Sequence, residues 1–263
     1  MKFAIGVSYC GTGLEGWQSQ PSGNTVQDHL SRALSEIGGE PIAVTGAGRT
    51  DAGVHASAQV AHFETSAERP ESAWVRGANS LLPDEIAVQW ATPVPGDFHA
   101  RYSALSRSYR YVLYSHPVRP ALFAGRTGWF HLPLDVEKMR EAVDSLIGQH
   151  DFSSFRSAEC QARSPVRIMQ SAGIRASGAY FLFDFTANAF LHHMVRNIVG
   201  ALVYVGNGRQ PPSWIGELLA GRDRTRAAPT FASAGLYFTG VDYPTRFNLP
   251  ATCAPLRIPL NRP

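Results

Sequence analysis

The segment "PIAVTGAGRTDAGVHASAQVAHFET", residues 41–65, decides how the first half of the chain is organised. Both of its ends have the composition of short strands, and the loop "TGAGRTDAGVHA" at residues 45–56 joins them. That loop sets Arg49, Thr50 and Asp51 among glycines and alanines. Small residues allow another segment or a ligand to approach the backbone closely. The loop is therefore the first candidate functional site.

The residues around this segment predict a β-α-β-β-α-β order, in which the glycine-rich loop joins the two middle strands. Apolar residues recur at helical spacing over residues 25–37, and Gly38 and Gly39 end that helix. The other expected elements are strands at 2–9 and 85–92 and a helix at 72–82.

The second half repeats this order in outline. The expected strands are 107–115, 166–177, 179–188 and 232–241, and the expected helices are 135–147, 190–205 and 213–220. We therefore expect an α+β fold of two ferredoxin-like, RNA-recognition-motif-like halves, with a continuous mixed sheet and a central active-site cleft. The expected boundaries are 1–103 for the half carrying the Asp51 loop, 104–248 for a basic second half, and 249–263 for a tail.

Composition and charge narrow the class of protein. No apolar run approaches the ~20 residues of a membrane span, and the three cysteines are far apart and in no paired spacing. These features predict a cytoplasmic protein without disulfides, thiolate metal sites or membrane association. Residues 1–102 carry a net charge of −5 and residues 103–247 a net charge of +6. Such asymmetry is expected where one face meets a polyanion.

The segment "FLHHMVRNIVGALVYVG" predicts a buried helix from Phe190, because it is apolar nearly all round. His192, Arg196 and Gly200 then form one polar stripe at spacings of four. A buried guanidinium requires a carboxylate or an anion beside it. Asp184 and Asp51 are the two candidate partners for Arg196.

The loop chemistry leaves three alternatives, of which a single ionised carboxylate fits best. A phosphate cradle is disfavoured because the loop lacks the lysine and hydroxyl of a P-loop and carries an aspartate. A metal site at Asp51 and His55 lacks a third convergent ligand, and adjacent His192 and His193 point in different directions on a helix. A lone ionised acid fits nucleophilic or general-base work.

Aromatic and basic residues alternate in a second region, "FHARYSALSRSYRYVLYS" at residues 98–115. Tyr109 and Tyr111 share one face of the expected strand, and Arg110 lies on the other. Aromatic rings beside arginines can stack on bases and bind phosphates, although tyrosines are also simply good strand formers. The segment "FRSAECQARSPVR" at 155–167 adds further arginines.

Taken in order, "GAGRTDAGVHA", "FHARYSALSRSYRY", "FSSFRSAECQARSPVR" and "NAFLHHMVRNIVGAL" resemble the bacterial tRNA pseudouridine synthase A family, from Val7 to about Gly240. The resemblance implies the pseudouridine synthase fold, a homodimer, and a tRNA partner. It implies isomerisation of uridine to pseudouridine at positions 38, 39 and 40 of the anticodon stem-loop, with base flipping and with neither cofactor nor metal.

The same resemblance implies roles for individual residues. Asp51 is then the catalytic nucleophile and Arg196 its partner. Tyr109 stacks on the target base, and Arg49 helps to flip it. The positions expected to contact RNA are Phe98, His99, Ala100, Arg101, Tyr102, Glu159, Cys160, Gln161, Ala162 and Arg163.

Two points stay open at the level of sequence. The intermediate can be a covalent adduct or a glycal. Two other classes of protein also remain as alternatives, an RNA-binding module without chemistry and a metal-dependent hydrolase. The first lacks the aromatic RNP1 pattern, and the second lacks the ligands that it needs.

Overall fold

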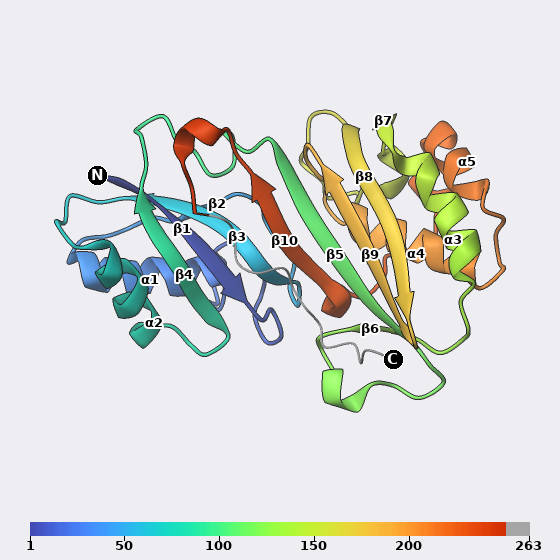
Figure 1. Ribbon diagram of the computed structural model, residues 1–263, viewed down its shortest axis with the longest axis horizontal. Coiled ribbons are helices and arrows are strands. Elements are labelled where there is room, and N and C mark those ends of the chain that lie inside the picture. Colours follow the sequence, from blue (N-terminus) through green and yellow to red (C-terminus); the bar gives the residue numbers. More distant parts are fainter. Residues whose placement is uncertain (251–263) are drawn as a thin grey trace. The chain divides into compact units, whose positions relative to one another are not determined.

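A computed structural model describes residues 1–250 of the chain, which form two compact units (Figure 1). Among these residues the first unit comprises 1–105 and 237–250, and the second comprises Ser106–Leu236. Residues 237–248, which we assigned to the second half, thus pack with the first. Most of the expected tail, from residue 251 on, lies outside the described residues. No helix within residues 1–250 is long and apolar enough to cross a bilayer.

The sheet of the first unit has the strand order of a ferredoxin-like fold. Its strands are β1 (Lys2–Tyr9), β2 (Thr45–Gly46), β3 (His55–Glu64), β4 (Ile86–Pro93) and β10 (Leu236–Asp242). Strand β1 lies between β4 and β3 and is antiparallel to both. The short β2 pairs antiparallel with the other edge of β3, and β10 pairs there in parallel, with Tyr237 opposite His55. The strand expected at the start of segment 41–65 is thus reduced to two residues, Thr45–Gly46.

Two helical segments cover one face of this sheet. Helix α1 (Val26–Gly38) begins at Thr25, whose side chain accepts from the Asp28 amide, and ends at Gly39 in the left-handed region. The expected helix at 72–82 is instead a π-helical turn (Ala73–Gly77) followed by the short α2 (Ala78–Leu81). The apolar pattern still holds, because buried Trp74 contacts Phe3 and Phe63 on the sheet.

The second unit repeats the strand arrangement of the first. Its sheet has the order β5 (Ser106–Ser115), β9 (Tyr180–Ala187), β8 (Val166–Ser177) and β7 (Gly148–Asp151), all antiparallel. Strand β6 (Gly128–Phe130) pairs in parallel with β5. The order β5-β9-β8 corresponds to β1-β3-β2, so the two units share a topology without a visible sequence repeat.

Three helices belong to the second unit: α3 (Val136–Val143), α4 (Met194–Gly206) and α5 (Trp214–Gly221). Asp135 caps α3 by accepting from two backbone amides. Helix α3 packs against both α4 and β8, and it is followed by a 3₁₀ turn at Asp144–Leu146. The hydrophobic residues on α3 and α4 therefore form the core beside the sheet.

Helix α4 begins four residues later than its sequence predicts. His193 adopts a left-handed conformation with φ of 62°, so His192 and His193 precede the helix. The predicted polar stripe that included His192 is therefore wrong, whereas Arg196 and Gly200 do lie on α4. Gly200 permits close packing, since a Cβ there would lie 2.4 Å from the carbonyl oxygen of Pro229.

The glycine-rich loop between β2 and β3 is held from within the first unit by Thr50. The hydroxyls of Thr50 and Tyr9 are hydrogen-bonded at 2.8 Å, and both side chains are buried. The Thr50 carbonyl accepts from the Trp17 amide at 3.0 Å, and a Cβ at Gly16 would lie 2.5 Å from that same oxygen. Burial raises the pKa of Tyr9 to about 12, outweighing its hydrogen bond to Thr50, so the phenol keeps its proton.

The Tyr9–Thr50 contact predicts a strong coupling between two conservative substitutions. Tyr9→Phe or Thr50→Val alone should lower the free energy of unfolding by about 1–3 kcal/mol, because each leaves a buried hydroxyl without this partner. The double variant should cost clearly less than the sum of the two single variants. Urea unfolding of the four proteins at neutral pH measures the cycle, and strict additivity would show that the two hydroxyls act independently.

Candidate functional site

The Arg49–Asp51 stretch shows an alternation of burial that follows from the Thr50 anchor. Thr50 is buried, its neighbour Arg49 is exposed, and Asp51 is half-buried. Because Thr50 turns into the core, the two charged side chains flank it on a backbone that cannot shift without breaking the Tyr9 and Trp17 contacts. Arg49 and Asp51 are thus both carried by a loop whose backbone these contacts hold.

The loop closes immediately after Asp51 in a tight turn. The Val54 amide donates to the Asp51 carbonyl at 3.1 Å, and Gly53 supplies the left-handed conformation that the turn requires, with φ of 78°. Val54 is buried, and it anchors the far side of the turn as Thr50 anchors the near side. The position of the Asp51 backbone is therefore set from both directions.

His55, one half of the metal pair considered from the sequence, has a structural role. Its Nδ1 accepts a hydrogen bond from the Gly11 amide at 3.0 Å, and its buried ring stacks on Tyr237 at 4.6 Å between centroids. Nδ1 is thereby committed to the backbone. The close approach also requires Gly11, since a Cβ there would lie 2.1 Å from the Val54 carbonyl oxygen.

Tyr109 and Tyr111 lie on the buried face of β5 and have different surroundings. Tyr109 is 9% exposed, and its ring meets Phe190 edge to face at 4.9 Å. The Tyr111 hydroxyl donates to the Ala232 carbonyl at 2.8 Å, and burial raises its pKa. Tyr111 is thus a core residue, in agreement with its reading as an ordinary strand tyrosine.

Arg196 and Asp184 have separate hydrogen-bond partners within the second unit. Asp184 accepts from Arg110 Nε at 2.6 Å through Oδ1 and from Arg175 at 2.8 Å through Oδ2. Arg196 is half-buried, and its Nε donates to the Phe231 carbonyl at 2.8 Å. Both oxygens of Asp184 therefore serve arginines of the sheet, which disfavours Asp184 as the partner that the sequence left open for Arg196.

The first expected RNA-contact segment, 98–102, divides into buried and exposed side chains. Phe98 and Ala100 are buried, and His99 is half-buried. Arg101 and Tyr102 are exposed, and the guanidinium of Arg101 lies 5.6 Å from the centre of the Tyr102 ring. Two of the five residues thus present a cation and an aromatic surface together.

The second expected RNA-contact segment, 159–163, is held by Arg156. The sequence by itself marked this residue only as one of the further arginines of segment 155–167. Arg156 donates to the carbonyls of Cys160 and Ala162 at 2.6 and 2.9 Å. Glu159, Gln161 and Arg163 are exposed around this arginine. Cys160 Sγ accepts from the His192 amide, and the thiol is free. Arg156 therefore organises the loop through its backbone.

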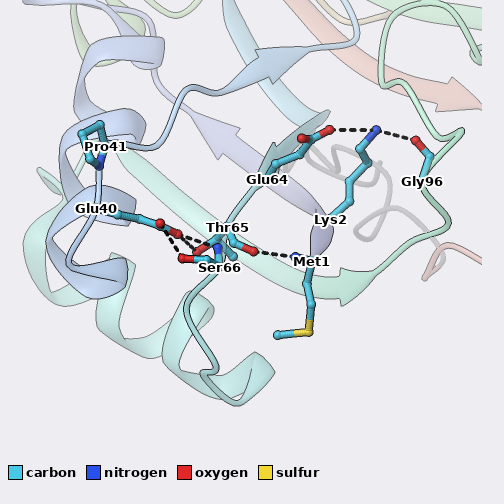
Figure 2. A pocket seen from close by; sticks show the side chains of 8 residues that line it. All are labelled: Met1, Lys2, Glu40, Pro41, Glu64, Thr65, Ser66 and Gly96. Carbon is cyan, nitrogen blue, oxygen red and sulfur yellow. Dashed lines mark hydrogen bonds and ion pairs between the residues drawn. The ribbon is translucent and has the colours of Figure 1, made fainter.

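A surface pocket in the first unit contains none of the predicted site residues (Figure 2). Its polar groups bind one another: Glu40 accepts from Thr65 and Ser66, and Lys2 bridges Glu64 and the Gly96 carbonyl. The contact between Tyr9 and Thr50 was not predicted from the sequence. Thr50 lies inside the selected loop, but nothing local marks Tyr9 as its partner.

Comparison with known proteins identifies the family. A family model described as tRNA pseudouridine synthase matches residues 5–103 and 142–244. Proteins named tRNA pseudouridine synthase A are similar over nearly the whole chain. The one from Dechloromonas aromatica is 58% identical over 95% of each chain, and the one from Chromobacterium violaceum is 59% identical over 99% of this chain and 100% of its own.

A solved structure of a Cbf5-Nop10-Gar1 complex matches 90% of this chain and 48% of its own, at 12% identity. Its TM-score of 0.36 is too low to support a conclusion. The sequence relatives and the family model decide the matter. The family model covers the Asp51 loop and α4, and the relatives extend over nearly the whole chain. Together they show that the chain belongs to the tRNA pseudouridine synthase family, has that family's α+β fold, and is an isomerase that forms pseudouridine in tRNA.

Proposed function

We propose that this protein isomerises uridine to pseudouridine at positions 38, 39 and 40 of the tRNA anticodon stem-loop, with Asp51 as the catalytic nucleophile. The observation that carries the assignment of Asp51 is its placement: a half-buried carboxylate on a loop locked by Thr50 and Val54. A nucleophile must be held at a fixed distance from the reacting carbon, and this loop has the rigidity to do so.

The reaction requires no added atoms. The N1–C1′ bond of uridine breaks, the uracil turns, C5 bonds to C1′, and the C5 proton leaves to solvent or a base. The freed N1 takes up a proton, so that product and substrate are isomers. In this proposal the Asp51 carboxylate either attacks C1′ to give a covalent adduct or removes a ribose proton to give a glycal. The balance of the reaction requires neither a metal nor a cofactor. The resemblance assigns Arg196 the task of keeping the carboxylate ionised.

Access to C1′ requires that the nucleotide leave its stack, which costs a few kcal/mol. Arg49 is exposed two residues before Asp51, so it can reach the RNA from the same rigid loop. Tyr109 is proposed to stack on the extracted uracil, which would replace part of the lost stacking energy. The assignments of Arg49 and Tyr109 and the homodimer rest on the family resemblance, whereas the proposed cytoplasmic location rests on composition and cysteine spacing.

The exposed residues of segments 98–102 and 159–163 are proposed to bind tRNA outside the reacting nucleotide. Arg101, Tyr102 and Arg163 offer the two contacts that RNA favours, a guanidinium for phosphate and a ring for a base. His99, Phe98, Ala100, Cys160 and Ala162 are less exposed, so their contribution is to shape these segments.

Asp51→Asn should abolish pseudouridine formation while tRNA binding stays within a few-fold of the unsubstituted protein. The amide is nearly isosteric but cannot act as nucleophile or base. Tritium release from tRNA labelled at uracil C5 measures turnover, and filter binding measures affinity. Asp84→Asn, which changes an exposed acid of the same unit, is the matched control. Turnover by Asp51→Asn beyond what deamidation to Asp supplies would refute the assignment.

Tyr109→Phe should bind tRNA normally but turn over slowly, and Tyr109→Leu should do neither well. Phenylalanine keeps the ~1–3 kcal/mol of base stacking and removes only the hydroxyl, which we expect to take part in removal of the C5 proton. Tyr114→Phe, on the same strand, is the control. Rates for Tyr109→Phe close to those of the unsubstituted protein would leave this residue a stacking role alone and require another acceptor for the proton.

A further inference from the structure

The backbone of residues 96–103 is tied down at nearly every step within the first unit. The Phe98 ring is buried against Tyr243 and Phe247, and the Phe98 carbonyl accepts from Lys2 Nζ at 3.2 Å. The same amine donates to the Gly96 carbonyl at 2.6 Å (Figure 2). The Tyr243 hydroxyl donates to the Ala100 carbonyl at 2.6 Å. This segment is therefore a built structure, although it is a loop.

Two histidines complete these ties through the same ring atom. Nδ1 of His62, on β3, accepts from the Ala100 amide at 3.2 Å. Nδ1 of His99 accepts from the amides of Arg101 and Tyr102 at 3.1 and 3.2 Å. An Nδ1 that accepts from an amide carries no proton, so each ring is neutral with its proton on Nε2. Three consecutive amides, at residues 100–102, thus depend on two neutral imidazoles.

The same rings form a row of tilted ring contacts that leads from the core to the surface. The centroids of His62 and His99 are 4.7 Å apart, and those of His99 and Tyr102 are 4.3 Å apart. His62 is buried, whereas Tyr102 is 76% exposed at the outer end of the row. The orientation of the Tyr102 ring, and of Arg101 beside it, is therefore coupled to the two histidines.

The charges around the pair favour the neutral rings. Burial lowers the pKa of His62 to about 4, assisted by His99 and Lys2 and opposed by Glu64. Burial also lowers the pKa of His99, assisted by Lys2 and Arg101. A second proton would have to enter at Nδ1, directly against the amide donors. The neutral state is thus favoured by hydrogen-bond geometry and by electrostatics alike.

We propose that His62 and His99 are positioning residues for tRNA binding: their unprotonated Nδ1 atoms hold the backbone of residues 100–102, so that Arg101 and Tyr102 meet the RNA in a fixed orientation. Protonation of either ring releases this backbone and weakens tRNA binding without altering the chemistry at Asp51. The inference rests on the proposed contact between residues 98–102 and tRNA. A histidine that acted instead as a cationic phosphate contact would bind tRNA more tightly as the pH falls, which is the opposite trend.

A matched pair of substitutions tests which ring atom matters. In His99→Asn the amide oxygen takes the place of Nδ1, whereas in His99→Gln it takes the place of Nε2. At pH 7.5 we expect His99→Asn to bind an unmodified tRNA transcript within about threefold of the unsubstituted protein, and His99→Gln to bind about tenfold more weakly. KM should follow the affinity, and kcat should stay unchanged in both. His62→Asn and His62→Gln should show the same order.

The pH dependence supplies a second readout. Because the folded state lowers the pKa of His62, its contribution to stability is complete above about pH 6.5 and is lost as the pH falls toward 4. The unsubstituted protein should therefore lose stability over this window more steeply than His62→Asn, whose amide does not titrate. Its tRNA affinity should fall only as the pH approaches 4, where the folded protein takes up the proton. Urea unfolding and filter binding from pH 7.5 to 4.0 measure both quantities.

Arg101→Ala and Tyr102→Ala separate the proposed RNA contact of residues 98–102 from the positioning role of the two histidines. If both bind tRNA like the unsubstituted protein, residues 98–102 make no RNA contact, and the contact and the positioning role are both overturned. If they weaken binding but the Asn and Gln variants behave alike, or kcat falls in place of affinity, the positioning role alone is overturned. Should the His62 variants fail to fold, the half-exposed His99 pair decides the outcome.

Discussion

The hydrogen bond between the Tyr9 and Thr50 hydroxyls is the contact on which the candidate site depends. It places a polar side chain of the glycine-rich loop in the core, beside the backbone contacts that Trp17 and Gln59 make to the same loop. Thr50 lies between the two residues with proposed chemical roles, Arg49 and Asp51. A displacement of Thr50 would therefore move the guanidinium and the carboxylate together. Close packing at Gly16 makes such a displacement costly, because the Thr50 carbonyl already fills that space.

The same physical device recurs wherever a loop of this protein must keep its shape. A side chain on a strand or a helix bonds to the backbone of a neighbouring loop: Gln59 to the Gly48 carbonyl, His55 to the Gly11 amide, and His62 to the Ala100 amide. In the second unit Asn197 on α4 donates to the Phe155 carbonyl. Buried backbone groups require partners, and these side chains supply them where no strand is available. The loops can then carry exposed charged and aromatic residues without losing their conformation.

The spacing of apolar residues predicted helices and strands well where it follows a single helical or strand period. The strands at 107–115 and 166–177 and the helix at 25–37 agree closely with β5, β8 and α1. The prediction was wrong at the start of α4, where helical spacing continues through His192 and His193 although the backbone of His193 is left-handed. It was also too long at β2, where the apolar residues Ile42 and Val44 are buried without pairing in a ladder. The apolar pattern predicts that these residues are buried, but it does not predict whether they belong to a helix, a strand or a loop. That depends on their backbone hydrogen-bond partners, which lie elsewhere in the chain.

The sequence by itself determined the α+β class, the order of strands and helices, the family, and Asp51 as the residue of chemical interest. Each of these follows from local composition or from a contiguous motif. Tertiary structure alone decided that Tyr9 anchors Thr50 from 41 residues away, that His62 binds the Ala100 amide from 38 residues away, and that β10 joins β3 in the first unit. It also decided that Asp184 serves Arg110 and Arg175. The physical reason is that a buried polar side chain takes whichever partner the fold brings within hydrogen-bonding distance, and no local pattern encodes that distance.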